Sequence, residues 1–194
     1  YESLSGTNVL WDFVELPSQV LENWCYEKEC LDLFAKHYET GESIPQEYID
    51  QIKAAQTFRS GTGTLRQLSF GKLDMNWHGT PVRKINDVEA FESESMKEFE
   101  LYPGVDGGCM STGFAHIFQG GYSSGYYSYK WAEVLDADAF EFFKEKGIFS
   151  KEVAQAFRDN ILSKGGTQDP SVLYKNFRGR EADPKALLKR SGLV

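Results

Sequence analysis

The sequence of 194 residues contains few of the residue types that mark a metal or redox site directly. Its three histidines lie about 40 residues apart, and no His-Glu-x-x-His pattern places two imidazoles on one helix face. Its three cysteines are odd in number and form no Cys-x-x-Cys pair, which argues against a disulfide framework or a zinc knot. We therefore expect a reducing compartment, with Cys25 and Cys30 as buried apolar side chains.

Basic residues and long apolar runs are scarce as well. The chain has 21 Lys and Arg against 29 Asp and Glu, which gives a net charge of −8. Nucleic-acid binding needs clustered cations, so we expect no nucleic-acid partner. No apolar run approaches the ~20 residues that span a bilayer, so we expect no membrane partner. The chain begins at Tyr1 without an initiator Met or a signal-like segment, which predicts a C-terminal fragment of a longer protein.

What the chain does have is helical patterning and a composition that is 41% hydrophobic. From Asp12 onward, apolar residues recur at helical spacing and predict one amphipathic helix of about six turns: Phe13, Leu16, Val20, Trp24, Leu31 and Phe34. Period-2 alternation is not sustained anywhere, so strands are at most short. We expect residues 1–194 to form a single, mainly α-helical unit that is part of one domain.

Capping residues predict further helices. The expected boundaries are a start between Ser43 and Pro45, a break near 61–63, a long helix over 126–146 that stops at Gly147, and starts at Ser150, Asp169-Pro170 and Asp183-Pro184. The basic residues near the C-terminus are expected to form ion pairs that balance the acidic body.

The first segment with chemical potential runs from Asp12 to Gln19. Asp12 followed three residues later by Glu15 is typical of a capping box, which would make Glu15 structural. A carboxylate on the first turn of a helix can also be a zinc ligand beside two histidines, although the pattern alone favours the cap. The residues alone leave both interpretations open.

The second segment is rich in glycine and tyrosine. Seven of the 18 glycines fall within residues 104–125, and His116, Tyr126 and Tyr129 lie in or just after this stretch. An imidazole and phenol hydroxyls are neutral donors that suit a peptide carbonyl or a developing oxyanion. The alternative is a glycine-rich turn before an aromatic-packed helix. A phosphate loop is disfavoured, because no Gly-Lys-Ser/Thr follows.

Together these segments resemble the thimet oligopeptidase family of zinc metallopeptidases, which includes oligopeptidase A and peptidyl-dipeptidases. The resemblance is carried by Ser5-Gly6-Thr7, by the run from Asp12 to Gln19, by Glu22-Asn23-Trp24, by the stretch from His116 to Trp131, and by Gly165-Gly166, Asp169-Pro170, Tyr174 and Phe177-Arg178-Gly179-Arg180. It spans nearly the whole chain. The resemblance implies the C-terminal part of a helical, zincin-like catalytic domain.

The resemblance also implies roles for individual residues. Glu15 would be the third zinc ligand, with Asp12 as a supporting hydrogen-bond partner or a mere cap. His116, Tyr126 and Tyr129 would contact the substrate and stabilise the tetrahedral intermediate. The glycine loop that closes over a bound peptide would consist of Gly120, Gly121, Tyr122 and Gly125.

The sequence departs from the family pattern because both histidine ligands and the general base are missing. The implied activity, hydrolysis of short peptides with release of C-terminal dipeptides, therefore belongs to a parent protein that holds one zinc ion. We expect this chain alone to be inactive, to lack native zinc and to need the rest of its own chain, the zinc helix and channel domain upstream, as its partner. The expected compartment is the cytoplasm, with the periplasm as the alternative.

Two other functions stay open at this point. The chain can be a non-catalytic helical domain that uses the glycine loop and tyrosines only to hold a peptide. A weaker alternative is a cysteine hydrolase in which Cys109 is the nucleophile and His116 the base.

Overall fold

The computed structural model describes residues 1–5, 7–79, 85–102 and 107–194, and Gly6 and Gly104 of the sequence motifs lie outside these ranges. The described part is mainly α-helical, as predicted, and its only β pairing is an isolated antiparallel bridge between Lys36 and Ser43. The contacts divide it into two compact units, residues 1–60 with 132–194, and residues 61–131. That the chain forms a single domain stays a prediction.

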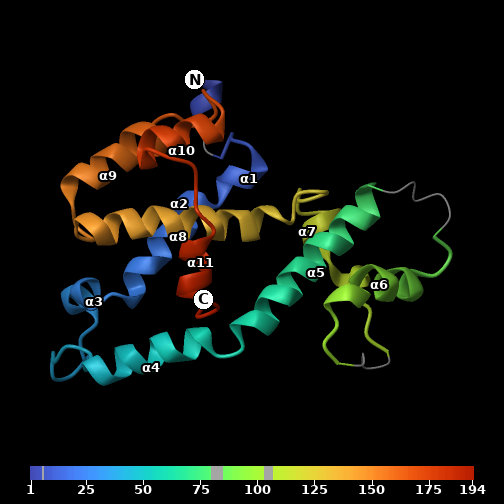
Figure 1. The fold of residues 1–194 in the computed structure, drawn as a ribbon, viewed down its shortest axis with the longest axis horizontal. Helices are drawn as coiled ribbons and strands as arrows, with labels where there is room; N and C mark the ends of the chain where they lie inside the picture. Colours follow the sequence, from blue (N-terminus) through green and yellow to red (C-terminus); the bar gives the residue numbers. More distant parts are fainter. Residues whose placement is uncertain (6, 80–84, 103–106) are drawn as a thin grey trace. The chain divides into compact units, whose positions relative to one another are not determined.

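The first unit contains helices from both ends of the sequence (Figure 1). They are α1 (Trp11–Val14), α2 (Leu16–Glu22), α3 (Lys28–Phe34), α4 (Gln46–Thr57), most of α8 (Ser128–Lys146), α9 (Lys151–Phe157), α10 (Pro170–Arg178) and α11 (Lys185–Arg190). A π-helical turn, Arg158–Leu162, continues α9. In the core of the first unit, the apolar face of α8 packs against α1, α2, α9 and α10. In Figure 1, α9 and α10 lie alongside α8.

The expected six-turn helix from Asp12 is wrong, because the structure breaks it in two places. Pro17, which lacks an N–H, lies at the start of α2, just after Glu15 ends α1. A 3-10 turn, Asn23–Tyr26, and an extended Glu27 then separate α2 from α3. Part of the predicted stripe is still buried, but Phe34 is exposed. Cys25 is also exposed, contrary to expectation.

The other boundaries agree better with the sequence. Ser150 accepts a hydrogen bond from the Val153 N–H and Asp169 from the Ser171 N–H, so both cap helices as predicted. Gly147 takes a φ of +97° where α8 ends. The break predicted near 61–63 instead falls at Phe58 and Arg59, and α5 (Ser60–Gly79) runs through those glycines.

Three arginines near the C-terminus pair with two aspartates that are buried on α8. Asp136 accepts hydrogen bonds from Arg190 and, at 2.9 Å, from Asn23. Asp138 pairs with Arg180 at 2.5 Å and with Arg178 at 3.5 Å. The predicted ion pairing of this region is confirmed for these arginines, although their partners are buried in the core.

The second unit is built on the C-terminal half of α5. Phe70, Leu73 and Trp77 form one buried face and pack against Phe114 and Ile117. Half-buried side chains of α6 (Val88–Met96) and of the segment 107–126 cover the edges of this cluster. A one-turn helix, α7 (Ala115–Phe118), carries His116. No helix in the described parts of the chain is both long and apolar enough to cross a membrane.

Candidate functional site

Glu15 lies at the junction of α1 and α2, and its side chain is half-buried. The Ser18 hydroxyl donates to the Glu15 carbonyl oxygen at 3.0 Å and to its Oε2 at 3.3 Å. Asp12 occupies the first turn of α1, whose N-cap is Leu10. A capping box needs its first residue at the N-cap, so that interpretation of Asp12 and Glu15 is wrong.

A single carboxylate is not a zinc site, because zinc in enzymes takes three protein ligands and a water. Among the described residues, no group of three His, Cys, Asp or Glu side chains is placed to hold a metal ion. Glu15 suits one ligand position, since carboxylate oxygen is a normal zinc donor and this one is not fully buried.

In the second unit, the structure brings His116 together with three tyrosines. The His116 ring centroid lies 6.1 Å from Tyr122, 6.0 Å from Tyr126 and 6.2 Å from Tyr129. Tyr122 stacks on Tyr129 at 4.9 Å, and Tyr126 meets Tyr129 edge-on at 5.3 Å. Because His116 is exposed and the tyrosines are half-buried, the cluster forms a face that a ligand can reach.

Tyr126 also contacts residues outside this cluster. It precedes α8 by two residues, so it lies in a turn rather than in the helix that the sequence predicted from residue 126. Burial raises its pKa above the usual range and Tyr129 raises it further, whereas Arg66 opposes the shift. The hydroxyl therefore keeps its proton at neutral pH and can donate a hydrogen bond. In this structure it donates to Gln67 Oε1 at 3.3 Å.

Two of the three glycines between His116 and Tyr126 are required by local geometry. A Cβ on Gly120 would lie 2.9 Å from both the Cα and the carbonyl oxygen of His116. Gly121 has a φ of +84°, in the left-handed region that favours glycine. Gly125 is buried, but its Cβ would make only an ordinary contact with Tyr122. Gly120 and Gly121 thus let the chain fold back tightly after the histidine.

Two acidic side chains bind the backbone near the two ends of the segment 107–126. The sequence analysis did not single out either residue. Glu92, on α6, accepts hydrogen bonds from the Met110 N–H at 2.8 Å and the Ser111 N–H at 2.5 Å. Asp74, on α5, accepts from the N–H groups of Ser124 and Tyr126, each at 2.9 Å. Asp74 follows Leu73 on the buried face of its helix. An acidic residue among apolar neighbours was the sequence feature that could have indicated a buried carboxylate.

The cysteine-hydrolase alternative gains no support from the surroundings of Cys109. Its Sγ lies 3.6 Å from Glu92 Oε2. His116 instead packs among the tyrosine rings described above.

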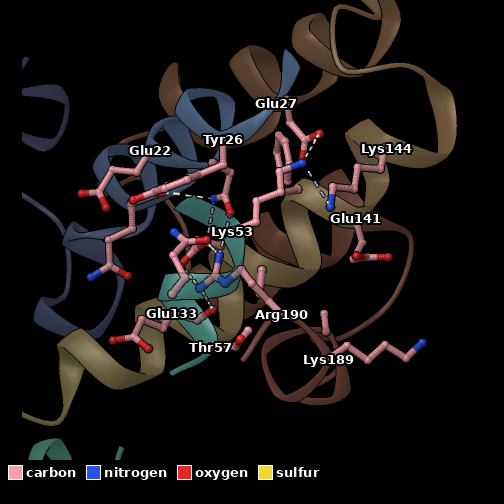
Figure 2. A pocket seen from close by; sticks show the side chains of 17 residues that line it. Glu22, Tyr26, Glu27, Lys53, Thr57, Glu133, Glu141, Lys144, Lys189 and Arg190 are labelled. Atoms are coloured by element: carbon pink, nitrogen blue, oxygen red, sulfur yellow. Dashed lines mark hydrogen bonds and ion pairs between the residues drawn. The ribbon is translucent and has the colours of Figure 1, made fainter. Parts of the chain in front are cut away.

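A cavity of about 550 Å³ in the first unit contains none of the predicted site residues. Its wall comes from α2, α4, α8, α11 and the turn 23–26, and Figure 2 shows charged side chains on several of these elements. Glu27 lies between Lys53, at 3.4 Å, and Lys144, at 3.5 Å. Arg190, labelled in Figure 2, also lines this cavity and is hydrogen-bonded to the buried Asp136.

Comparison with known proteins adds the family. The family model described as peptidase family M3 matches residues 1–193. This chain belongs to peptidase family M3. It is 46% identical to oligopeptidase A of Escherichia coli (strain K12) over 189 residues, which are 96% of this chain and 28% of that protein.

Two further relatives have lower sequence identity to this chain. Identity to dipeptidyl carboxypeptidase of the same bacterium is 36% over 195 residues, 100% of this chain and 29% of that protein. Identity to saccharolysin of Saccharomyces cerevisiae is 35% over 189 residues, 96% of this chain and 26% of that protein. The chain therefore spans little more than a quarter of the length of these relatives. The predicted resemblance to the thimet oligopeptidase family is confirmed, and members of peptidase family M3 are zinc-dependent in general.

Proposed function

We propose that this chain is part of a zinc-dependent peptidase that hydrolyses short peptides. The observation that carries the proposal is the cluster of His116, Tyr126 and Tyr129, three neutral donors on one accessible face of an M3 chain. Donors fixed in advance near a scissile carbonyl stabilise the oxyanion that forms as water adds. Removal of one such donor commonly raises the barrier by about 3 kcal/mol.

In the full-length protein, Glu15 would hold the zinc ion, which when bound lowers the pKa of a water molecule and polarises the scissile carbonyl. Asp12, one turn earlier, is proposed to support that ligand. Gly120 and Gly121 allow the tight turn that, with Tyr122 and Gly125, would close over the peptide. The tyrosine hydroxyls and the His116 imidazole would then donate hydrogen bonds to the substrate.

The test uses the full-length protein and quenched fluorescent peptides of about 10 residues. Tyr126→Phe and Tyr129→Phe should each lower kcat by about 100-fold or more, since each removes one hydroxyl donor. Tyr38→Phe is the matched control, because Tyr38 is exposed in the first unit. Wild-type-like kcat in both site variants would show that the cluster only binds peptide, as the non-catalytic alternative requires.

The zinc assignment has its own measurement. Glu15→Gln should lower the zinc content of the full-length protein, measured by elemental analysis after dialysis, because a neutral amide is a poor zinc ligand. Glu22→Gln, at the end of the same helix pair, is the control and should retain zinc. Equal zinc content in both variants would refute the role of Glu15.

We also propose that residues 1–194 alone neither hold catalytic zinc nor hydrolyse peptides, because they supply one of the three ligands. The isolated chain, purified with added zinc, should show no turnover above buffer. Turnover that a chelator abolishes would contradict this. The required partner is then the remainder of the same protein, and mixing the two parts should restore activity if they reassociate.

The finer proposal is release of C-terminal dipeptides. The higher identity to oligopeptidase A, 46% against 36% for dipeptidyl carboxypeptidase, favours cleavage at internal bonds as a second candidate. Mass spectrometry of the products from a peptide with a free C-terminus and from its C-terminal amide separates the two. Dipeptide release only from the free acid supports the first, and internal cuts in both peptides support the second.

The compartment stays a proposal as well, with the cytoplasm as the expected location. Relatives in Arabidopsis thaliana are named both as a probable cytosolic and as an organellar oligopeptidase A. Family membership therefore does not fix the compartment. Fractionation of cells that express the full-length protein would decide it.

A further inference from the structure

Asp74 is a fully buried carboxylate whose partners belong to the turn that carries Tyr126. Its exposed fraction is 0%, and it lies on the face of α5 that packs in the core of the second unit. Oδ1 accepts the Ser124 N–H and Oδ2 accepts the Tyr126 N–H, both at 2.9 Å. The two oxygens therefore hold the backbone on either side of Gly125, where the glycine-rich segment ends.

The turn that Asp74 holds is strained. Ser124 has a φ of +57°, a left-handed conformation that is unfavourable for an L-residue other than glycine. Such conformations persist only where the surrounding structure fixes them, and they gather at functional sites. The hydrogen bond from the Ser124 N–H to a buried carboxylate is the fixing contact in this case.

His78 completes the surroundings of the carboxylate. Its Nδ1 lies 2.8 Å from Asp74 Oδ1, one helical turn away, and 3.0 Å from the Asp74 carbonyl oxygen. On its other side, the His78 ring meets Phe118 of α7 at 5.6 Å. A buried carboxylate needs several donors to offset its lost hydration, and His78 adds one to the two backbone groups.

We propose that Asp74 is a positioning residue that sets the place of the Tyr126 hydroxyl, and through ring contact that of Tyr129, for the reaction. This inference rests on the proposed peptidase function. Only an acceptor at both oxygens satisfies two backbone N–H groups at once. An asparagine would point an N–H₂ group at one of them, so the charge and the symmetry of the carboxylate both matter.

The experiment uses the full-length protein and the fluorescent peptide assay. Asp74→Asn should lower kcat by about 10-fold or more and change KM by less than about 3-fold, because a misplaced donor is felt mainly in the transition state. Asp138→Asn is the matched control. It also removes a buried charge, but its partners are Tyr174 and two arginines of the first unit. A purely structural role for Asp74 would lower the melting temperature in both variants and leave kcat per folded molecule unchanged.

The decisive readout is the coupling between Asp74 and Tyr126. If Asp74 acts through the hydroxyl, Tyr126→Phe should lose about 100-fold in kcat in the wild-type background but less than about 10-fold in Asp74→Asn. Ser124→Gly should restore part of the activity of Asp74→Asn, because glycine adopts the turn without strain. Losses that simply multiply, with no rescue by Ser124→Gly, would overturn the proposal.

Two other results are informative, namely a variant that does not fold and a wild-type protein that is inactive. If Asp74→Asn does not fold, Asp74→Glu replaces it, since it keeps the charge but displaces the oxygens by one methylene. Lower kcat in that variant supports positioning, and wild-type kcat refutes it. If the wild-type full-length protein cleaves no peptide, the proposed function and the role of Asp74 both fall. An active wild type with multiplicative losses refutes only the role of Asp74.

Discussion

The glycine pair Gly165-Gly166 supports a prediction that does not depend on the chemistry of the protein. The Gly166 N–H donates to the Ser3 carbonyl oxygen at 2.8 Å, which joins this turn to the segment that leads toward Glu15. A Cβ on Gly166 would lie 2.4 Å from the Asn8 carbonyl oxygen, which is a backbone atom. An ordinary contact begins near 3.4 Å, so Gly166→Ala must move one backbone by about 1 Å.

The expected cost follows from that displacement. Overpacking against a backbone that cannot rotate away costs about 1–3 kcal/mol, and the hydrogen bond to Ser3 is strained as well. We expect about 2–3 kcal/mol of local stability to be lost. Since 1.36 kcal/mol is a factor of ten, amide protection of the Gly166 region should fall roughly 30- to 150-fold.

Gly63→Ala is the matched control, because it makes the same chemical change with the opposite expected sign. Gly63 lies in the exposed part of α5, and a Cβ there would meet nothing within 4 Å. Replacing glycine by alanine in a helix contributes up to about 1 kcal/mol of stability, so protection of α5 should rise up to about 5-fold.

Hydrogen exchange of the full-length variants, followed by mass spectrometry, measures both regions in one experiment. Unchanged protection around Gly166 in Gly166→Ala would refute the close approach of Asn8. Loss of protection in Gly63→Ala would refute the assignment of that residue to a free helix surface.

Three further substitutions test other parts of the chain. Gly120→Ala should lower peptidase kcat without abolishing folding, because its Cβ would lie 2.9 Å from the backbone of His116; wild-type kinetics would contradict that contact. Tyr174→Phe should lower the free energy of unfolding by about 1–3 kcal/mol, since it removes the 2.8 Å hydrogen bond to the buried Asp138; urea unfolding measures this. Burial raises the pKa of Glu92, but hydrogen bonds from the segment 109–111 outweigh it and hold the pKa below its usual 4.5. Its stabilising effect is present above that pH and is lost as the pH falls, so Glu92→Gln should weaken the acid dependence of unfolding between about pH 5 and 3.

The parts of the fold that could be predicted from the sequence are those fixed by local chemistry. Ser150 and Asp169 cap their helices because a side-chain oxygen within three residues satisfies a free N–H, which a sequence shows directly. The break after Glu22 has a different origin. There Asn23 turns its amide inward to Asp136, which lies 113 residues away, and a local pattern cannot show such a contact.

The candidate site divides in the same way. The proximity of His116, Tyr126 and Tyr129 follows from a short motif, and the structure brings their rings together. Asp74 was missed although it interrupts an apolar face. An acidic residue on the apolar face of a predicted helix indicates a buried carboxylate, but the sequence does not show which donors bind it.

Three buried aspartates on two long helices show that the role of a buried carboxylate depends on the groups that it contacts. Asp136 and Asp138 on α8 each meet an arginine, so charge is balanced and the contact ties the C-terminal segment to the core. Asp74 on α5 meets backbone N–H groups and His78 instead. An arginine pair holds a side chain that can adapt its position, whereas two backbone bonds fix the path of the main chain itself. Because that path carries Tyr126, substitution of Asp74 should be felt in catalysis, while equal damage to Asp138 should be felt only in stability.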